Sequence, residues 1–172
     1  IDDRGTLTYG ELAQRSRRFA AALLAAGIRR EERVLLVAHD TSEWPVAFLG
    51  AMYAGVVPVA LNTLLTAADY AYVLGHSRAR AAIVSAPLVP VLSEAMALGP
   101  HELQALVVIG DEAPAAVAGL PGGTHGFESF LGAAGPLDRP AATCGDSIGF
   151  WLYSSGSTGR PKGTVHCHAS PW

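Results

Sequence analysis

The sequence predicts an α/β fold with a largely parallel sheet flanked by helices. Half of the 172 residues are apolar and 16% are charged, a composition that suits one sizeable buried core. Short apolar runs alternate with segments of helical periodicity as far as residue 109. This alternation is typical of parallel strands joined by helices, for which right-handed crossovers are expected.

The first expected helix begins after Thr8, because Thr8 and Glu11 have the Thr-x-x-Glu spacing of a capping box. Phe19 and Leu23 then recur on one helical face, and Gly27 is a suitable terminator. Three arginines of this helix are expected to be mostly available to solvent: Arg15, Arg17 and Arg18.

Strands and further helices alternate after the first helix. Residues 34–37 are all apolar, as in a strand covered on both faces. Ser42 is expected to cap the second helix, whose first turn tolerates Pro45, and Thr66 begins the third. The expected strands are residues 33–38, 56–61, 81–85, 106–109 and 148–153, and the expected helices after the first are residues 43–54, 66–76, 89–98 and 127–134.

Glycine and proline interrupt the chain between residues 110 and 144. We expect a surface excursion there with one short helix near residues 127–134. The strand at residues 148–153 should then rejoin the same core, so the excursion does not divide two domains.

Charge and cysteine content argue against several classes of partner. A net charge of −3 gives no broad attraction for nucleic acid or for an anionic membrane surface. No run reaches the roughly 20 apolar residues that span a bilayer. Cys144 and Cys167 make neither a disulfide framework nor a four-ligand zinc site, and they fit a cytoplasmic setting.

The most distinctive segment follows the last expected strand and is rich in glycine and hydroxyl groups. Its glycines let the backbone approach a ligand closely, and successive N–H groups in such a loop form a concavity for anions. The hydroxyls add donors, Lys162 adds a positive charge, and Pro161 stiffens the backbone before it. The segment therefore predicts a polyphosphate site. It reads Tyr153-Ser154-Ser155-Gly156-Ser157-Thr158-Gly159-Arg160-Pro161-Lys162-Gly163.

Two general motifs do not fit this segment. A Walker A loop counted from Gly156 requires glycine where Pro161 stands and a hydroxyl residue where Gly163 stands. A Gly-x-Ser-x-Gly elbow centred on Ser157 requires glycine where Ser155 stands. Its acid and histidine would also have to lie within the nine residues that follow the segment. A P-loop NTPase and an α/β-hydrolase are both poorly supported.

The histidines do not predict a metal site. His166 and His168 flank Cys167, but strand alternation would put both histidines on one face and the thiol on the other. No carboxylate or second thiol follows them. The other four are expected at the surface or half-buried: His39, His76, His101 and His125.

The polyphosphate segment resembles the phosphate-binding signature of the adenylate-forming superfamily, which includes acyl-CoA synthetases, peptide synthetase adenylation domains and luciferases. Two upstream blocks resemble the same superfamily in the same order: Leu7-Thr8-Tyr9-Gly10-Glu11-Leu12 and Leu49-Gly50-Ala51-Met52-Tyr53-Ala54-Gly55-Val56-Val57-Pro58-Val59. Four blocks are similar to its benzoate-CoA ligase branch: Trp44-Pro45-Val46-Ala47-Phe48-Leu49, Leu61-Asn62-Thr63-Leu64-Leu65-Thr66, Asp69-Tyr70-Ala71-Tyr72 and Phe150-Trp151-Leu152.

The resemblance implies a carboxylate–CoA (acid–thiol) ligase that uses ATP, Mg²⁺ and coenzyme A to activate a small aromatic carboxylate. It implies that Lys162 neutralises phosphate charge and that His166 lies near the nucleotide or acyl pocket. No catalytic residue is assigned, because the adenylation lysine of the superfamily belongs to a later domain. The implied phosphate-contacting hydroxyls are Ser154, Ser155, Ser157 and Thr158, with Gly156 and Gly159 supplying the backbone geometry.

The resemblance also implies that residues 1–172 are the first part of a large N-terminal AMP-binding domain. The rest of that domain and the mobile C-terminal domain are expected beyond this chain, which should be inactive alone. Two alternatives stay open. One is an adenylation domain that loads a carrier protein, and the other is a non-catalytic nucleotide-binding module that ends at Trp172.

Overall fold

The computed structural model describes residues 5–110, 113–154 and 161–170. Its helices are α1 (Tyr9–Ala25), α2 (Glu43–Tyr53), α3 (Ala67–Ser77), the 3₁₀ turn η1 (Ala86–Leu88), α4 (Val89–Leu98) and α5 (Phe127–Gly132). Its strands are β1 (Arg33–Val37), β2 (Val57–Ala60), β3 (Ala81–Ser85), β4 (Ala105–Ile109), β5 (Gly123–Gly126), β6 (Ile148–Ser154) and β7 (Lys162–Cys167).

The strands form one sheet in the order β5-β4-β3-β1-β2-β6-β7. Every neighbouring pair is parallel except β6 and β7, which run antiparallel at one edge. The expected α/β fold with a largely parallel sheet is confirmed. None of the helices in the described residues is both long and apolar enough to cross a membrane.

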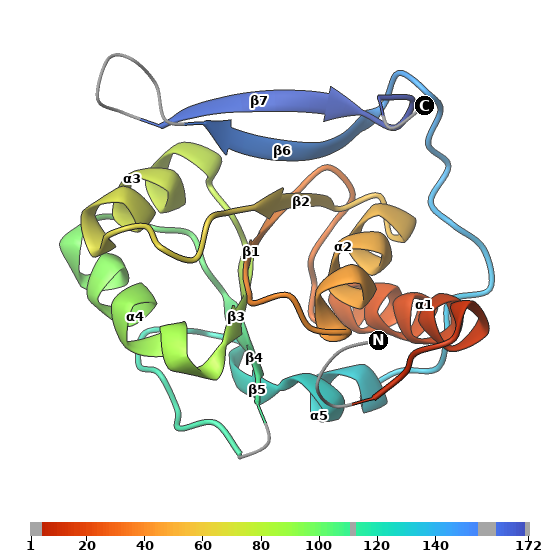
Figure 1. Ribbon diagram of the computed structural model, residues 1–172, viewed down its shortest axis with the longest axis horizontal. Coiled ribbons are helices and arrows are strands. Elements are labelled where there is room, and N and C mark those ends of the chain that lie inside the picture. Colours follow the sequence, from red (N-terminus) through yellow and green to blue (C-terminus); the bar gives the residue numbers. More distant parts are fainter. Residues whose placement is uncertain (1–4, 111–112, 155–160, 171–172) are drawn as a thin grey trace.

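Helices cover both faces of the sheet, with α3 and α4 on one side and α1, α2 and α5 on the other (Figure 1). Strand side chains alternate between the faces, so each strand contributes to two cores. Leu36 lies in the core with α1 and α2, whereas its neighbour Leu35 lies in the core with α3 and α4. This double burial explains why the strands read as continuous apolar runs.

The predicted helix starts at Thr8 and Thr66 are confirmed by reciprocal capping bonds, from Thr8 to Glu11 and from Thr66 to Asp69. Ser42 behaves differently from the prediction. Its backbone is already αR and its side chain makes no capping hydrogen bond. The second helix is fixed instead by packing of its buried face against α1 and the sheet.

The arginines of α1 are less exposed than expected. Each is partly buried, because this face of α1 is covered by the returning chain. Arg15 pairs with Glu128 of α5. Arg17 donates from Nε to the carbonyl of Leu137 at 2.7 Å.

Two local expectations also need correction. The stretch read as an excursion contains strand β5, which pairs with β4 through backbone bonds and packs few apolar side chains of its own. His168 lies in a turn after β7, so strand alternation does not extend to it.

Candidate functional site

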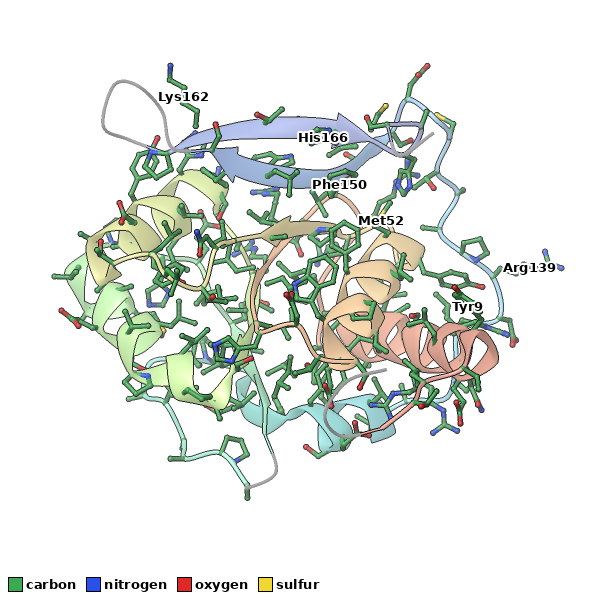
Figure 2. The ribbon with its side chains drawn as sticks, viewed as in Figure 1. Tyr9, Met52, Arg139, Phe150, Lys162 and His166 are labelled. Carbon is green, nitrogen blue, oxygen red and sulfur yellow. The ribbon has the colours of Figure 1, made fainter. Side chains whose placement is uncertain are left out.

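The β6–β7 hairpin carries the described ends of the predicted phosphate segment. Ser154 is the last residue of β6 and Lys162 the first of β7, and the two are paired in register. Both are exposed. Figure 2 shows Lys162 at the start of β7 with its side chain directed away from the helices.

Five predicted phosphate-contacting residues lie outside the described residues, and their roles stay predictions: Ser155, Gly156, Ser157, Thr158 and Gly159. The hairpin nevertheless defines where this segment begins and ends. Ser154 ends β6, which runs parallel to β2, so the segment leaves the sheet at the carboxyl ends of the parallel strands. Ligands of open α/β sheets bind outside this edge.

Strand alternation gives the hairpin two different faces. One face carries the paired side chains of Ser154 and Lys162, and the other carries Tyr153 beside Gly163. Tyr153 packs with the core formed by α3 and α4. Its hydroxyl is hydrogen-bonded to Nδ1 of His76 at 2.5 Å.

The phenol of Tyr153 is held in its neutral form. Burial raises the pKa of Tyr153 to about 12, and the nearby Tyr72 phenol acts in the same direction, whereas the Arg33 guanidinium opposes it. Arg33 lies over the ring of Trp151 at 5.9 Å. The Tyr153 hydroxyl therefore stays protonated at pH values at which an exposed phenol has ionised.

His166 is half-buried on β7 and belongs to a column of aromatic side chains. Its ring stacks on Phe150 of β6 with a centroid distance of 4.6 Å and an interplanar angle of 5°. Figure 2 shows both residues on the adjoining strands. Phe150 meets Phe48 of α2 at 5.4 Å, and Phe48 stacks on Trp44 at 5.1 Å. The column therefore links His166 to the start of α2.

Trp44 also lines a cleft of about 310 Å³ at the carboxyl ends of β1 and β2. The backbone N–H of His39 donates to Oγ of Ser85 at 3.0 Å, which ties β1 to β3 at this edge. Oδ1 of Asn62 accepts from the N–H of Leu64 at 2.9 Å. The cleft is lined by Ala38, His39, Asp40, Trp44, Ala60, Leu61, Asn62 and Thr63. A larger cleft of about 670 Å³ adjoins it and shares Asp40 and Trp44.

The polar residues of this cleft received no role from the sequence. His39 is expected at the surface or half-buried, and its side chain is exposed, whereas Asp40, Asn62 and Thr63 carry no predicted function. The available signal is that these residues directly follow β1 or β2. The carboxyl ends of two paired parallel strands lie side by side, so residues that follow them come together. Within residues 5–110, 113–154 and 161–170, no three His, Cys, Asp or Glu side chains gather in a way that could hold a metal ion.

Known proteins match this chain along almost its whole length. A 4-hydroxybenzoate–CoA/benzoate–CoA ligase of Rhodopseudomonas palustris is 43% identical over 171 residues, which cover 99% of this chain and 30% of that protein. A crystallised benzoate CoA ligase from Burkholderia xenovorans LB400 is 52% identical with a TM-score of 0.83, over 98% of this chain and 31% of its own.

An anthranilate CoA ligase, solved in complex with anthranoyl-AMP, is 29% identical with a TM-score of 0.88, over 98% of this chain and 31% of its own. The chain thus spans about 30% of the length of these relatives. The AMP-binding enzyme family matches residues 1–171. The chain therefore belongs to the AMP-binding enzyme family.

Proposed function

We propose that this chain is the first part of the N-terminal domain of an ATP-dependent aryl-CoA ligase. In the first step a carboxylate oxygen of the aromatic acid attacks the α-phosphorus of Mg·ATP. The bond from that phosphorus to the bridging oxygen of the β-phosphate breaks, which gives an acyl-adenylate and pyrophosphate. In the second step the thiolate of coenzyme A attacks the acyl carbon and AMP leaves.

The proposed contribution of this chain is to hold the phosphates that leave. Ser154, Ser155, Ser157 and Thr158 would donate to the β- and γ-phosphates, with Gly156 and Gly159 shaping the backbone around them. Lys162 would neutralise their charge. Fixed donors and a cation aimed at developing negative charge need no reorganisation during the reaction, which is why such groups accelerate it. The described ends of the segment support this role, because Ser154 and Lys162 are paired, exposed and close to the carboxyl ends of the parallel strands, where open α/β sheets commonly bind ligands.

The observation that carries the proposal is the match of almost all of this chain to about 30% of the length of aryl-CoA ligases, at 43% identity in one case and 52% in another. His166 is proposed to lie near the nucleotide or acyl pocket, which the aromatic column to Trp44 and the cleft supports. We also propose a cytoplasmic location, with which the free thiols of Cys144 and Cys167 agree.

The proposal is tested by supplying the full-length protein with Mg·ATP, coenzyme A and a panel of benzoate, hydroxybenzoates, aminobenzoates and aliphatic acids. We expect aryl-CoA and AMP to form with at least one aromatic acid, and little thioester with the aliphatic acids. Activity confined to a carrier protein in place of coenzyme A would favour the alternative of a carrier-loading adenylation domain. No product from any aromatic acid would contradict the proposal.

A further inference from the structure

Tyr153 of β6 is joined to α3 through His76. The hydroxyl of Tyr153 lies 2.5 Å from Nδ1 of His76, and the two rings meet edge to face at 5.7 Å. The His76 ring is itself held by stacking on Tyr72, at 5.5 Å and 19°. Tyr72 and His76 are one helical turn apart, so both rings of this stack project from the same side of α3, where His76 is exposed.

The ring of Tyr153 also covers the partner strand. Tyr153 and Gly163 are paired in register. A Cβ at Gly163 would lie 3.2 Å from Cζ of Tyr153, so the ring lies directly over the glycine backbone. One side chain therefore contacts β6, β7 and α3 at the end of the hairpin that leads into the phosphate segment.

The opposite face of the same hairpin presents Ser154 and Lys162, each adjacent in sequence to a residue of this anchor. Ser154 follows Tyr153, and Lys162 precedes Gly163. A rotation or shift of the hairpin about the Tyr153 ring would move both polar side chains together. β7 is an edge strand, so backbone pairing restrains it on one side alone.

We infer that His76 is a positioning residue for phosphate binding. By its hydrogen bond to Tyr153 it sets the orientation of the hairpin, and thereby the placement of Ser154 and Lys162 against the β- and γ-phosphates. His76 itself makes no contact with substrate in this role. The inference rests on the proposed function of the hairpin. It adds His76, which lies 77 residues before Tyr153 in the sequence.

The test is a double-mutant cycle in the full-length protein with Tyr153→Phe, His76→Phe and the two combined. Each variant keeps an aromatic ring and removes one partner of the hydrogen bond. We expect each single change to raise the KM for ATP by about threefold to tenfold, the range of one net hydrogen bond. The double variant should be no worse than either single one, because both remove the same interaction.

Readouts besides overall activity separate positioning from general weakening. The KM for the aromatic acid and the rate of thioester formation from a preformed acyl-adenylate should stay unchanged. His76→Asn, which can place an acceptor near the position of Nδ1, should recover most of the affinity for ATP. The matched control is Tyr53→Phe. Tyr53 is the last residue of α2, and its phenol donates to the carbonyl of Asp138 at 3.4 Å.

The outcomes distinguish this inference from the proposed function. If Lys162→Ala raises the KM for ATP but the Tyr153 and His76 variants do not, the positioning role is overturned and the phosphate site stands. If Lys162→Ala also has no effect, the proposed function of the hairpin is overturned. Additive effects in the cycle, or equal rises in the KM for ATP and for the acid, would show a structural role without positioning.

Discussion

At the scale of single residues, the ionisation of Tyr153 should make the stability of the protein depend on pH. Burial raises the pKa of Tyr153 to about 12 in the folded protein, whereas an unfolded chain releases this proton near pH 10. Below pH ~10 the proton is bound in both states, and this group causes no pH dependence. Between pH ~10 and ~12 the unfolded state loses the proton first, so folding becomes less favourable as the pH rises.

We expect the stability difference between the parent protein and Tyr153→Phe to narrow across this window. The variant lacks the hydroxyl and is less stable at neutral pH, but it escapes the loss that the ionisable phenol causes at high pH. Denaturant unfolding of both proteins at a series of pH values measures the difference. A difference that stays constant through the window would contradict the buried environment of Tyr153.

Lys162 and Ser157 are predicted to act on the departing pyrophosphate. Lys162→Ala or Ser157→Ala should slow the adenylation half-reaction by about 10²-fold, the usual loss for one group that stabilises developing charge. Thioester formation from a preformed acyl-adenylate should slow much less, because the adenylate no longer carries the β- and γ-phosphates. Rapid-quench measurement of each half-reaction checks this.

Arg139→Ala is the control for removal of an exposed cation. Arg139 lies on the segment that connects α5 to β6, far from Lys162 (Figure 2). It should leave both half-reactions unchanged. Equal slowing of the two half-reactions in the Lys162 and Ser157 variants would count against a role in holding pyrophosphate.

At the scale of helices and strands, α1 and α2 pack closely against each other at Gly50. A Cβ at Gly50 would lie 2.7 Å from the backbone oxygen of Ser16 and 3.0 Å from Cβ of Phe19. Gly50→Ala should gain about 1 kcal/mol in helix propensity but lose about 1–3 kcal/mol by overpacking. Because the nearest atom belongs to the backbone and cannot turn aside, we expect the overpacking loss to reach about 2–3 kcal/mol, which leaves a net loss of about 1–2 kcal/mol.

Gly10→Ala is the matched substitution, since Gly10 is also helical and an added Cβ there meets no atom within 4 Å. It should be neutral or stabilising by up to about 1 kcal/mol. Thermal and denaturant unfolding compare the two variants. Equal stability of both would contradict the close approach of α1 to α2.

The elements that the sequence predicted well are those with a local signal. Thr8 and Thr66 begin helices because their side chains bond to nearby backbone, and the spacing to Glu11 and Asp69 is visible in the sequence. β5 was missed because its residues, Gly123–Gly126, have no apolar pattern and are held by backbone pairing with β4. Such pairing depends on a strand that is distant in sequence, and no local pattern encodes it.

The residues of the candidate site also divide into those with a local sequence signal and those brought together only by the fold. Ser154 and Lys162 were assigned to phosphate binding from their own segment, whose composition is unusual, and that role stays a prediction. The partnership of Tyr153 with His76 was not predicted, because the two residues are 77 positions apart and meet only through the packing of α3 beside β6. The polar ends of β1 and β2 were likewise missed, since they form one cleft only after the strands have paired.

At the scale of the whole molecule, the three layers bring the hairpin and the strand-end cleft to one region of the sheet. β6 follows β2 in the sheet, and the cleft lies at the end of β2. The proposed ligase would use this edge to hold ATP, with the aromatic column connecting His166 to the cleft. The chain spans about 30% of the length of its relatives, and under the proposal the remaining substrate-binding segments belong to the other part of such a ligase.

Carboxylate-dependent exchange of pyrophosphate into ATP tests the central claim most directly, because it reports the adenylation step without coenzyme A. Measured with benzoate, it should be strong in the full-length protein, dependent on the acid, and absent from the 172-residue chain alone. Turnover by the 172-residue chain would contradict the view that it holds part of the site. Absence of exchange in the full-length protein with every aromatic acid would contradict the ligase itself.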